Sequence, residues 1–300
     1  MKNYDVAIVG GGPAGLSAAL VLARARRKVA VIDAGMPRNS ASPGVHAFLS
    51  RDGILPADLK KVSRKQISGY PDVDFVDQPV RHIRAANPGR GFGVALNAGE
   101  TLQAQAVVLA VGMIDELPDL PEFDRHWGRR IIHCPFCHGY ENAGSRWGVL
   151  ANDLDDVEKA ESYSFWTDTL TVFAEQRMHV PDELLGRLES RDIAVERRSI
   201  RQLISSDEGE LSALGMSDGS RVLCDTIVYR PRQRQTGVVM DSGVALSEIG
   251  RVWIDNNQQT SIRGIFAAGD LTPGCQDALA AAAEGAKAAK RALDNLRSIG

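Results

Sequence analysis

The chain has few cysteines, little excess charge and only one long uncharged run. Only four of its 300 residues are cysteine, and two of these, Cys224 and Cys275, stand alone in the sequence. This count does not support a disulfide scaffold, so we expect a reducing, cytoplasmic environment. The formal net charge of -3 at pH 7 offers no basic surface for nucleic acid. Residues 6–23 are uncharged over 18 residues, but glycines interrupt the middle of this run, so we expect a strand, a turn and a helix there. No other stretch approaches the roughly 18 to 20 uncharged residues of a membrane span, so a membrane is not expected either.

Strands and helices alternate along the chain. Residues 4–10 are predicted to form an apolar strand, 16–26 a helix and 28–35 a second strand, with a glycine turn between the first two elements. A second alternation begins after residue 113. We therefore predict an α/β fold of two Rossmann-like domains, the second inserted in the first. The expected boundaries give residues 1–113 and 247–300 to the first domain and 114–246 to the inserted one.

The first turn carries a dinucleotide-binding pattern. Gly10, Gly12 and Gly15 form G-x-G-x-x-G between the strand and the helix, and Asp33 ends the next strand. Glycines at these positions permit a tight turn and close approach of a pyrophosphate to the helix N-terminus, and the carboxylate accepts from a ribose hydroxyl. A plain glycine turn is the alternative, but strand, helix and distal acid all stand where a nucleotide site needs them.

The C-terminal part indicates which dinucleotide is bound. The stretch GIFAAGD, residues 264–270, resembles the second flavin motif of flavoproteins with two dinucleotide-binding domains. The resemblance implies FAD, with Asp270 near the ribityl and phosphate region, and we expect the polar loop at 37–51 to border the flavin. The expected FAD-binding residues are Gly10, Gly12, Pro13, Ala14, Gly15, Asp33, Ala34, Arg38, Asn39, His46, Val80, Ala110, Gly112, Gly269, Asp270, Gln276, Asp277 and Ala278.

A C-x-x-C pair, Cys134 and Cys137, opens the inserted domain. Such a pair exchanges electrons, binds a metal or packs. A structural zinc site needs four ligands, and neither a second C-x-x-C nor a suitably spaced histidine pair is present, so no metal is expected. Cys224 and Cys275 are expected to be small buried residues.

The order of motifs along the whole chain resembles the low-molecular-weight thioredoxin reductases. The resemblance implies that Cys137 faces the flavin, that Cys134 attacks the substrate, and that His138 stands in the acid position. An imidazole next to a thiol can take or return its proton near neutral pH, which makes His138 the candidate general base and acid. A capping or solvent-facing histidine is the alternative.

The sequence departs from these reductases where they bind NADPH. Gly148 remains, but the expected phosphate turn contains Asn152, Asp153, Asp155 and Asp156. The next strand ends in Glu175 rather than in arginines, so a 2'-phosphate lacks a fork of donors. We therefore expect a degenerate nicotinamide site. A divergent NADH site with Glu175 on the ribose is the alternative.

The stretch CPFCHGYE, residues 134–141, is similar to that of the dithiol oxidases of gliotoxin and holomycin biosynthesis. Cys134, Cys137, His138 and Glu141 carry this resemblance. It implies an FAD-dependent oxidase that closes a disulfide in a small-molecule or peptide dithiol, with electrons passing through the cysteine pair and FAD to oxygen. The wider family resemblance implies a homodimer.

Two other functions fit the same residues. One is a thiol-disulfide reductase supplied by ferredoxin or another donor that is not NADPH, and it would need a docking face for that donor. The other is a flavin-bound redox sensor in which the cysteines change conformation without turnover. Turnover of a dithiol under air separates the sensor from both enzymes.

Overall fold

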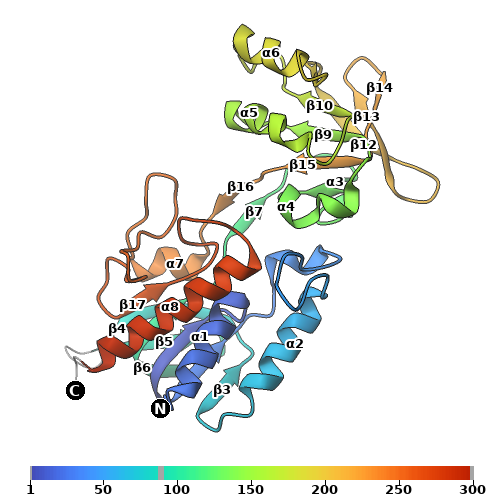
Figure 1. Cartoon of the computed structure of the whole chain (residues 1–300). Helices are drawn as coiled ribbons and strands as arrows, with labels where there is room; N and C mark the ends of the chain where they lie inside the picture. The colour runs from blue at the N-terminus through green and yellow to red at the C-terminus, as the bar shows by residue number, and fades with distance from the viewer. Residues whose placement is uncertain (1, 87–90, 298–300) are drawn as a thin grey trace. The chain divides into compact units, whose positions relative to one another are not determined.

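The computed structural model describes residues 2–86 and 91–297 and divides the chain into two compact units. Unit 1 comprises Met1–Ser40, Phe48–Asp115 and Gln233–Gly300, and unit 2 comprises Ala41–Ala47 and Glu116–Arg232. The chain leaves unit 1 through β7 (Ile114–Glu116) and returns through β16 (Arg232–Arg234), and these two strands pair. Figure 1 traces both units.

The boundaries differ from the predicted ones at three places. Residues 233–246 belong to unit 1 rather than to the inserted unit, residues 114–115 also belong to unit 1, and residues 41–47 belong to unit 2. Hydrogen bonds explain the first difference. The Gln233 side chain bonds Asp115 and Arg251, and the Gln235 amide donates to the Leu271 carbonyl, all within unit 1.

Unit 1 is built on a seven-stranded sheet, as far as the described residues show, in the order β3-β2-β1-β6-β5-β4 with β17 also on β6. Strands β1, β2, β3, β6 and β17 run parallel, and β4 and β5 add an antiparallel edge. The strands are β1 (Asn3–Val9), β2 (Val29–Ile32), β3 (Val73–Val76), β4 (Val80–Ala85), β5 (Phe92–Leu96), β6 (Thr101–Leu109) and β17 (Ile265–Ala267). The order around β1 is that of a dinucleotide-binding sheet.

Both faces of this sheet are buried. Along β1, Val6 and Ile8 pack in one apolar cluster while Ala7 and Val9 pack in another. This explains why the parallel strands consist of continuous runs of apolar residues. The helices of the unit are α1 (Pro13–Arg24), η1 (Arg38–Ala41), α2 (Pro56–Ile67), α7 (Gly237–Ser242) and α8 (Ala278–Arg297).

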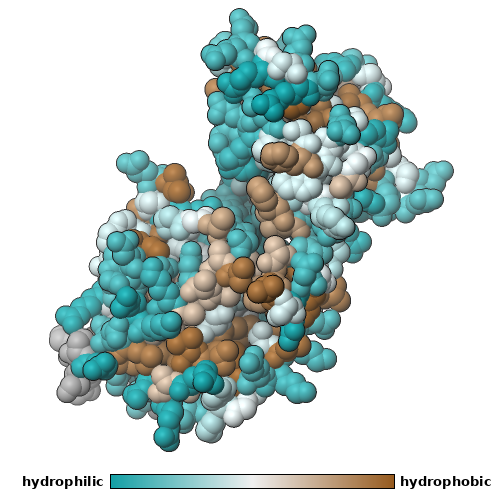
Figure 2. Space-filling model, viewed as in Figure 1, coloured by the Kyte–Doolittle hydropathy of each residue, from teal (hydrophilic) through white to brown (hydrophobic). Residues whose placement is uncertain are grey.

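Small residues hold α1 against α8, which run side by side in Figure 1. A Cβ atom added to Gly285 of α8 would lie 1.9 Å from the Ala14 carbonyl oxygen of α1. The alanines of α8 therefore serve close packing. Hydrophobic residues gather in this region of unit 1 in the space-filling view (Figure 2).

Unit 2 repeats the Rossmann-like plan. Its sheet has the order β11-β10-β9-β15-β8 with every pairing parallel, and a separate antiparallel sheet has the order β12-β13-β14. The strands are β8 (Ile131–Ile132), β9 (Trp147–Leu150), β10 (Leu170–Phe173), β11 (Ala194–Glu196), β12 (Ile200–Ser205), β13 (Leu211–Met216), β14 (Arg221–Leu223) and β15 (Thr226–Tyr229). The helices are α3 (Phe123–His126), α4 (Pro135–His138), η2 (Tyr140–Asn142), α5 (Leu154–Tyr163) and α6 (Asp182–Glu189).

The predicted α/β class, with two Rossmann-like folds and one inserted in the other, is confirmed. No helix within the described residues combines the length and the apolar character needed to cross a membrane.

Candidate functional site

The glycine loop after β1 is shaped by close backbone contacts. A Cβ atom on Gly10, which has φ +113°, would lie 2.1 Å from the Ala110 carbonyl oxygen, and one on Gly15 would lie 1.9 Å from the Gly10 carbonyl oxygen. At Gly12 nothing lies within 4 Å of the added atom. Gly10 and Gly15 are thus needed by the fold, whereas Gly12 opens onto space at the N-terminus of α1.

That N-terminus suits a phosphate group. Gly12 is its N-cap, no side chain caps it, and Pro13 begins the helix. The first backbone N–H groups of a helix lack partners within it, and the helix dipole favours an anion there. The loop therefore fits the pyrophosphate of a dinucleotide.

Asp33 directly follows β2, as the predicted ribose-binding acid should. Its Oδ1 accepts from the Gly35 N–H at 3.2 Å, and its Oδ2 lies 2.5 Å from Lys60 Nζ of α2. Sequence reasoning missed Lys60, because 27 positions separate the two residues. A ribose hydroxyl would share the carboxylate with this lysine.

The GIFAAGD segment forms a hydrogen-bonded corner around Asp270. Arg38 Nη2 lies 2.8 Å from Asp270 Oδ2, and its Nη1 lies 3.5 Å from Asp115 Oδ1. The Gln276 amide donates to the Asp270 carbonyl at 3.1 Å. Asp277 accepts from the Ala280 N–H at 2.7 Å and so caps the start of α8. The structure thus gives Asp277 a role in the helix that the sequence argument did not foresee.

The other predicted FAD-binding positions also lie in unit 1, with one exception. Ala14 lies in α1, Ala34 follows Asp33, Asn39 lies in η1, Val80 begins β4, Ala110 and Gly112 follow β6, Gly269 follows β17 and Ala278 begins α8. His46 is the exception, because it belongs to unit 2. The open glycine loop and the acid after β2 together fit the group that the resemblance implies.

The cysteine pair lies in a short turn that follows β8. Cys134 is the N-cap of α4, and its carbonyl oxygen accepts from the Cys137 N–H at 3.1 Å and the His138 N–H at 3.2 Å. Both cysteines are half-buried. The Asn142 amide donates to the His138 carbonyl at 2.8 Å, which anchors the end of the turn. Backbone bonds thus fix the two cysteines and His138 on one turn of chain.

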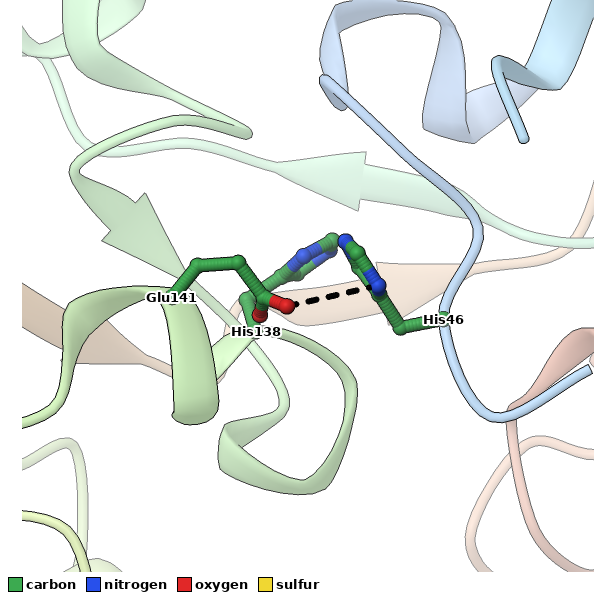
Figure 3. Close-up of side chains that lie close together, drawn as sticks. All are labelled: His46, His138 and Glu141. Carbon is green, nitrogen blue, oxygen red and sulfur yellow. Dashed lines mark ion pairs between the residues drawn. The ribbon is translucent and has the colours of Figure 1, made fainter. Parts of the chain in front are cut away.

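His138 meets residues from a distant loop. Its Nε2 lies 3.3 Å from the Ser42 Oγ, and its ring packs edge-on against that of His46 with centroids 5.7 Å apart. His46 Nδ1 in turn lies 3.4 Å from Glu141 Oε1 (Figure 3). Nothing in the sequence signals that Ser42 and His46 join His138, since 96 positions separate Ser42 from it.

Burial lowers the pKa of His138 below the usual value of 6.5. The positive charge that His46 can carry lowers this pKa further, and the Glu141 carboxylate opposes both effects. The imidazole is therefore neutral near pH 7 and able to accept a thiol proton. This is the state that a general base requires.

Aromatic rings surround the turn on the Phe136 side. Phe136 lies between the two cysteines, is exposed, and contacts Trp166 edge-on with centroids 5.2 Å apart. Trp166 stacks on the buried Trp147 at 6.1 Å. The ring of Phe136, between the two cysteines in the sequence, thus packs on Trp166, which in turn packs on the buried Trp147.

The other two cysteines differ from each other. Cys224 is buried, and burial raises the pKa of its thiol to about 12. Cys275 is exposed, so the expectation that it is a buried residue was wrong. It lies in the loop between β17 and α8, and the apolar residues of these two elements do not predict whether a loop residue between them is buried.

The turn after β9, where a nicotinamide cofactor would place its phosphates, is filled by side chains. Asp153 caps α5 by accepting from the Asp156 N–H at 3.1 Å, and Asp156 accepts from the Asn152 N–H at 2.9 Å. Arg230 lies 2.7 Å from Asp155 and 2.9 Å from Asp156. The carboxylates of Asp153 and Asp156 thus take up two backbone N–H groups of this turn, those of Asn152 and Asp156, which a pyrophosphate could otherwise use.

Two arginines change the electrostatic part of the sequence argument. Arg230 offsets much of the repulsion expected from Asp155 and Asp156. Arg177, two residues after Glu175, pairs with it at 2.8 Å. The prediction of a degenerate nicotinamide site therefore rests on the capped N-terminus of α5 more than on the acidic charge.

Comparisons with known proteins agree with this architecture. The family described as pyridine nucleotide-disulphide oxidoreductase matches residues 4–146 and 171–285, and the unmatched stretch between them contains β9 and α5. Thioredoxin reductase tcpT of Claviceps purpurea (strain 20.1) is 31% identical over 275 residues, which cover 89% of this chain and 86% of the relative. Thioredoxin reductase sirT of Leptosphaeria maculans is 30% identical over 285 residues, with the same two coverages of 89% and 86%.

Among solved structures, the crystal structure of HlmI superposes with a TM-score of 0.93 at 32% identity and covers 99% of this chain and 93% of that one. The family match spans well over half of the chain. The chain therefore belongs to the pyridine nucleotide-disulphide oxidoreductases, and within them to the thioredoxin reductase-like flavoproteins.

Proposed function

We propose that the protein is an FAD-dependent dithiol oxidase, which forms a disulfide in a small-molecule or peptide dithiol and uses oxygen as the acceptor. The occupied N-terminus of α5 carries this proposal, because it disfavours NADPH as a source of electrons. The CPFCHGYE motif, which is similar to that of known dithiol oxidases, supports it.

Residues of unit 1 would hold the FAD. The loop of Gly10, Gly12 and Gly15 would face the pyrophosphate, Asp33 a ribose hydroxyl, and the Asp270 corner the ribityl region. When bound, FAD would take two electrons from the cysteine pair and pass them to oxygen. The protein residues carry out the thiol chemistry that precedes this transfer.

Disulfide exchange starts with the Cys134–Cys137 pair oxidised. A substrate thiolate attacks the Cys134 sulfur, which forms a mixed disulfide and releases the Cys137 thiolate. The second substrate thiol loses its proton and attacks the substrate sulfur of the mixed disulfide. The substrate disulfide closes, and Cys134 leaves as a thiolate. The substrate has then lost two electrons and two protons, and the cysteine pair has gained the two electrons.

His138 would move the protons of this exchange. Its neutral imidazole accepts a proton as a thiol becomes the attacking thiolate, and it returns a proton when a thiolate must be neutralised. Ser42 and His46 contact this imidazole, and Glu141 in turn pairs with His46.

A reductase supplied by ferredoxin or another donor remains the nearest alternative, because it needs the same cysteines and no nicotinamide. A redox sensor without turnover is the other. Both share the fold, so a measurement of electron flow has to separate them.

The test is oxygen uptake by the FAD-loaded protein with a panel of aromatic, aliphatic and peptide dithiols. A dithiol oxidase should consume oxygen, with about one disulfide and one hydrogen peroxide formed per oxygen, since each requires two electrons. Cys134→Ser should abolish this activity, and Cys275→Ser, a cysteine outside the pair, should retain it. Failure of every dithiol to stimulate oxygen uptake would sink the proposal.

A further inference from the structure

His46, His138 and Glu141 place three ligand atoms within 4.8 Å of one another. Their side chains meet in Figure 3, although His46 comes from the 41–47 loop and the other two residues come from α4 and η2. One contact is short, since His46 Nδ1 and Glu141 Oε1 are 3.4 Å apart. Folding brings His46 to the other two residues, so the spacing of histidines and acids along the sequence does not indicate this group.

The chemistry of the three groups matches that of a divalent transition metal. Two imidazoles and one carboxylate are the protein ligands of several zinc enzymes, in which the fourth position is left to water or substrate. Metal binding takes both imidazoles in their neutral form, and the one carboxylate then gives the site a formal charge of −1, which suits a dication.

The partial burial of these side chains supports a site that binds the ion with moderate affinity, more weakly than a structural zinc site. The side chain of His46 is 18% exposed and that of Glu141 is 39% exposed, so an ion could enter and leave. The Ser42 hydroxyl lies 3.3 Å from His138 Nε2, a contact that restrains rotation of the imidazole ring. The acidic group of Asp153, Asp155 and Asp156 differs, because Arg230 already pairs with two of its members.

We propose that His46, His138 and Glu141 form an exchangeable zinc site beside the cysteine pair. Binding of zinc would occupy His138 and so prevent it from carrying protons. The open fourth position would accept water or a substrate thiolate, which is a strong zinc ligand. The inhibitory consequence rests on the proposed oxidase function, whereas the binding itself does not.

The binding test uses the FAD-loaded protein with the Cys134–Cys137 disulfide formed and with Cys275→Ser, so that these thiols do not bind the metal. Equilibrium dialysis against zinc, with metal analysis, should find about one ion per chain. His46→Ala and Glu141→Gln should each weaken binding by a factor on the order of 10 to 100. His179→Ala is the matched control, because His179 is an exposed histidine of the same unit, and it should bind as the parent protein does.

A second measurement keeps binding and function apart. Zinc should inhibit dithiol-dependent oxygen uptake in the Cys275→Ser protein, EDTA should restore it, and Glu141→Gln should shift half-inhibition to higher zinc by a similar factor. Zinc binding that survives both His46→Ala and Glu141→Gln would overturn the site, and so would the absence of binding. Binding that follows the ligands in a protein without dithiol turnover would support the site and count against the proposed function instead.

Discussion

At the scale of single residues, the two cysteines should be distinguishable by their spectra. The family resemblance assigns Cys137 to the flavin and Cys134 to the substrate. The two cysteines lie at opposite ends of one turn, which the bond from the Cys137 N–H to the Cys134 carbonyl closes. Cys134→Ser leaves Cys137 as a thiolate and should produce a long-wavelength charge-transfer band with oxidised FAD. Cys137→Ser should produce none. Bands of equal strength in both variants, or the reverse pattern, would show that the roles are assigned wrongly.

The proton-carrying role of His138 predicts a kinetic effect that is larger than its structural effect. His138→Ala should slow dithiol turnover by a factor of about 100 to 10,000, the usual contribution of a general base. The control is His179→Ala, which removes an exposed imidazole of the same unit. A loss of turnover in His138→Ala accompanied by loss of bound FAD or of the thermal transition would assign the histidine to structure instead.

The two solitary cysteines should react differently with thiol reagents. Burial raises the pKa of Cys224 to about 12, so at pH 8 almost none of it is thiolate, and its side chain is also shielded from solvent. Cys275 is exposed. After reduction, the native protein should therefore titrate with iodoacetamide at Cys134, Cys137 and Cys275, while Cys224 should react only after unfolding. Peptide mapping that finds Cys224 labelled in the native state would contradict its burial.

At the scale of elements, the glycine loop separates folding from cofactor binding. Gly12 has extended backbone angles and open space around it, so Gly12→Val should keep the fold but block the approach of a pyrophosphate. Gly15→Ala forces a methyl group toward the Gly10 carbonyl oxygen and should destabilise the protein by about 1 to 3 kcal/mol. Circular dichroism with thermal unfolding measures the fold, and absorbance near the flavin maximum measures FAD. A yellow Gly12→Val protein would refute this division.

The same elements show how far the sequence alone could go. Contacts within one turn of chain, such as Gly10 with Gly15 or Cys134 with His138, are predictable because the local spacing determines them. Contacts made by folding were not predictable: Lys60 on Asp33 and His46 on Glu141 join residues with no shared periodicity. The role of Asp277 as a helix cap was also missed, because a capping acid and a cofactor-binding acid look alike before the helix start is known.

At the scale of the whole molecule, the order of motifs was enough to predict two Rossmann-like units, since each unit contains its own strand, turn and helix, β1 and α1 in unit 1 and β9 and α5 in unit 2. The return point was not predictable at residue level. Residues 233–246 carry no motif, and their place in unit 1 depends on the hydrogen bonds of Gln233 and Gln235. Side-chain amides make such long-range bonds without leaving a pattern in the sequence.

The whole electron path yields the most discriminating prediction, namely that neither NADPH nor NADH reduces the flavin at a useful rate without oxygen. At the N-terminus of α5 the Asp156 N–H donates to Asp153, and the preceding Asn152 N–H donates to Asp156. The carboxylates of Asp155 and Asp156 pair with Arg230, and Asp155 also pairs with Lys159. Each charge-assisted bond that a pyrophosphate would lose is worth about 1.5 to 3 kcal/mol, or about tenfold or more in affinity.

Anaerobic stopped-flow absorbance provides the measurement. A substrate dithiol should bleach the flavin and air should restore its colour, whereas either nicotinamide should leave it oxidised. Rapid bleaching by NADH would favour a divergent reductase that uses Glu175, and bleaching by reduced ferredoxin alone would favour the ferredoxin-supplied reductase. The pattern of bleaching therefore identifies which donor reduces the flavin, and with it the direction in which electrons pass through Cys134 and Cys137.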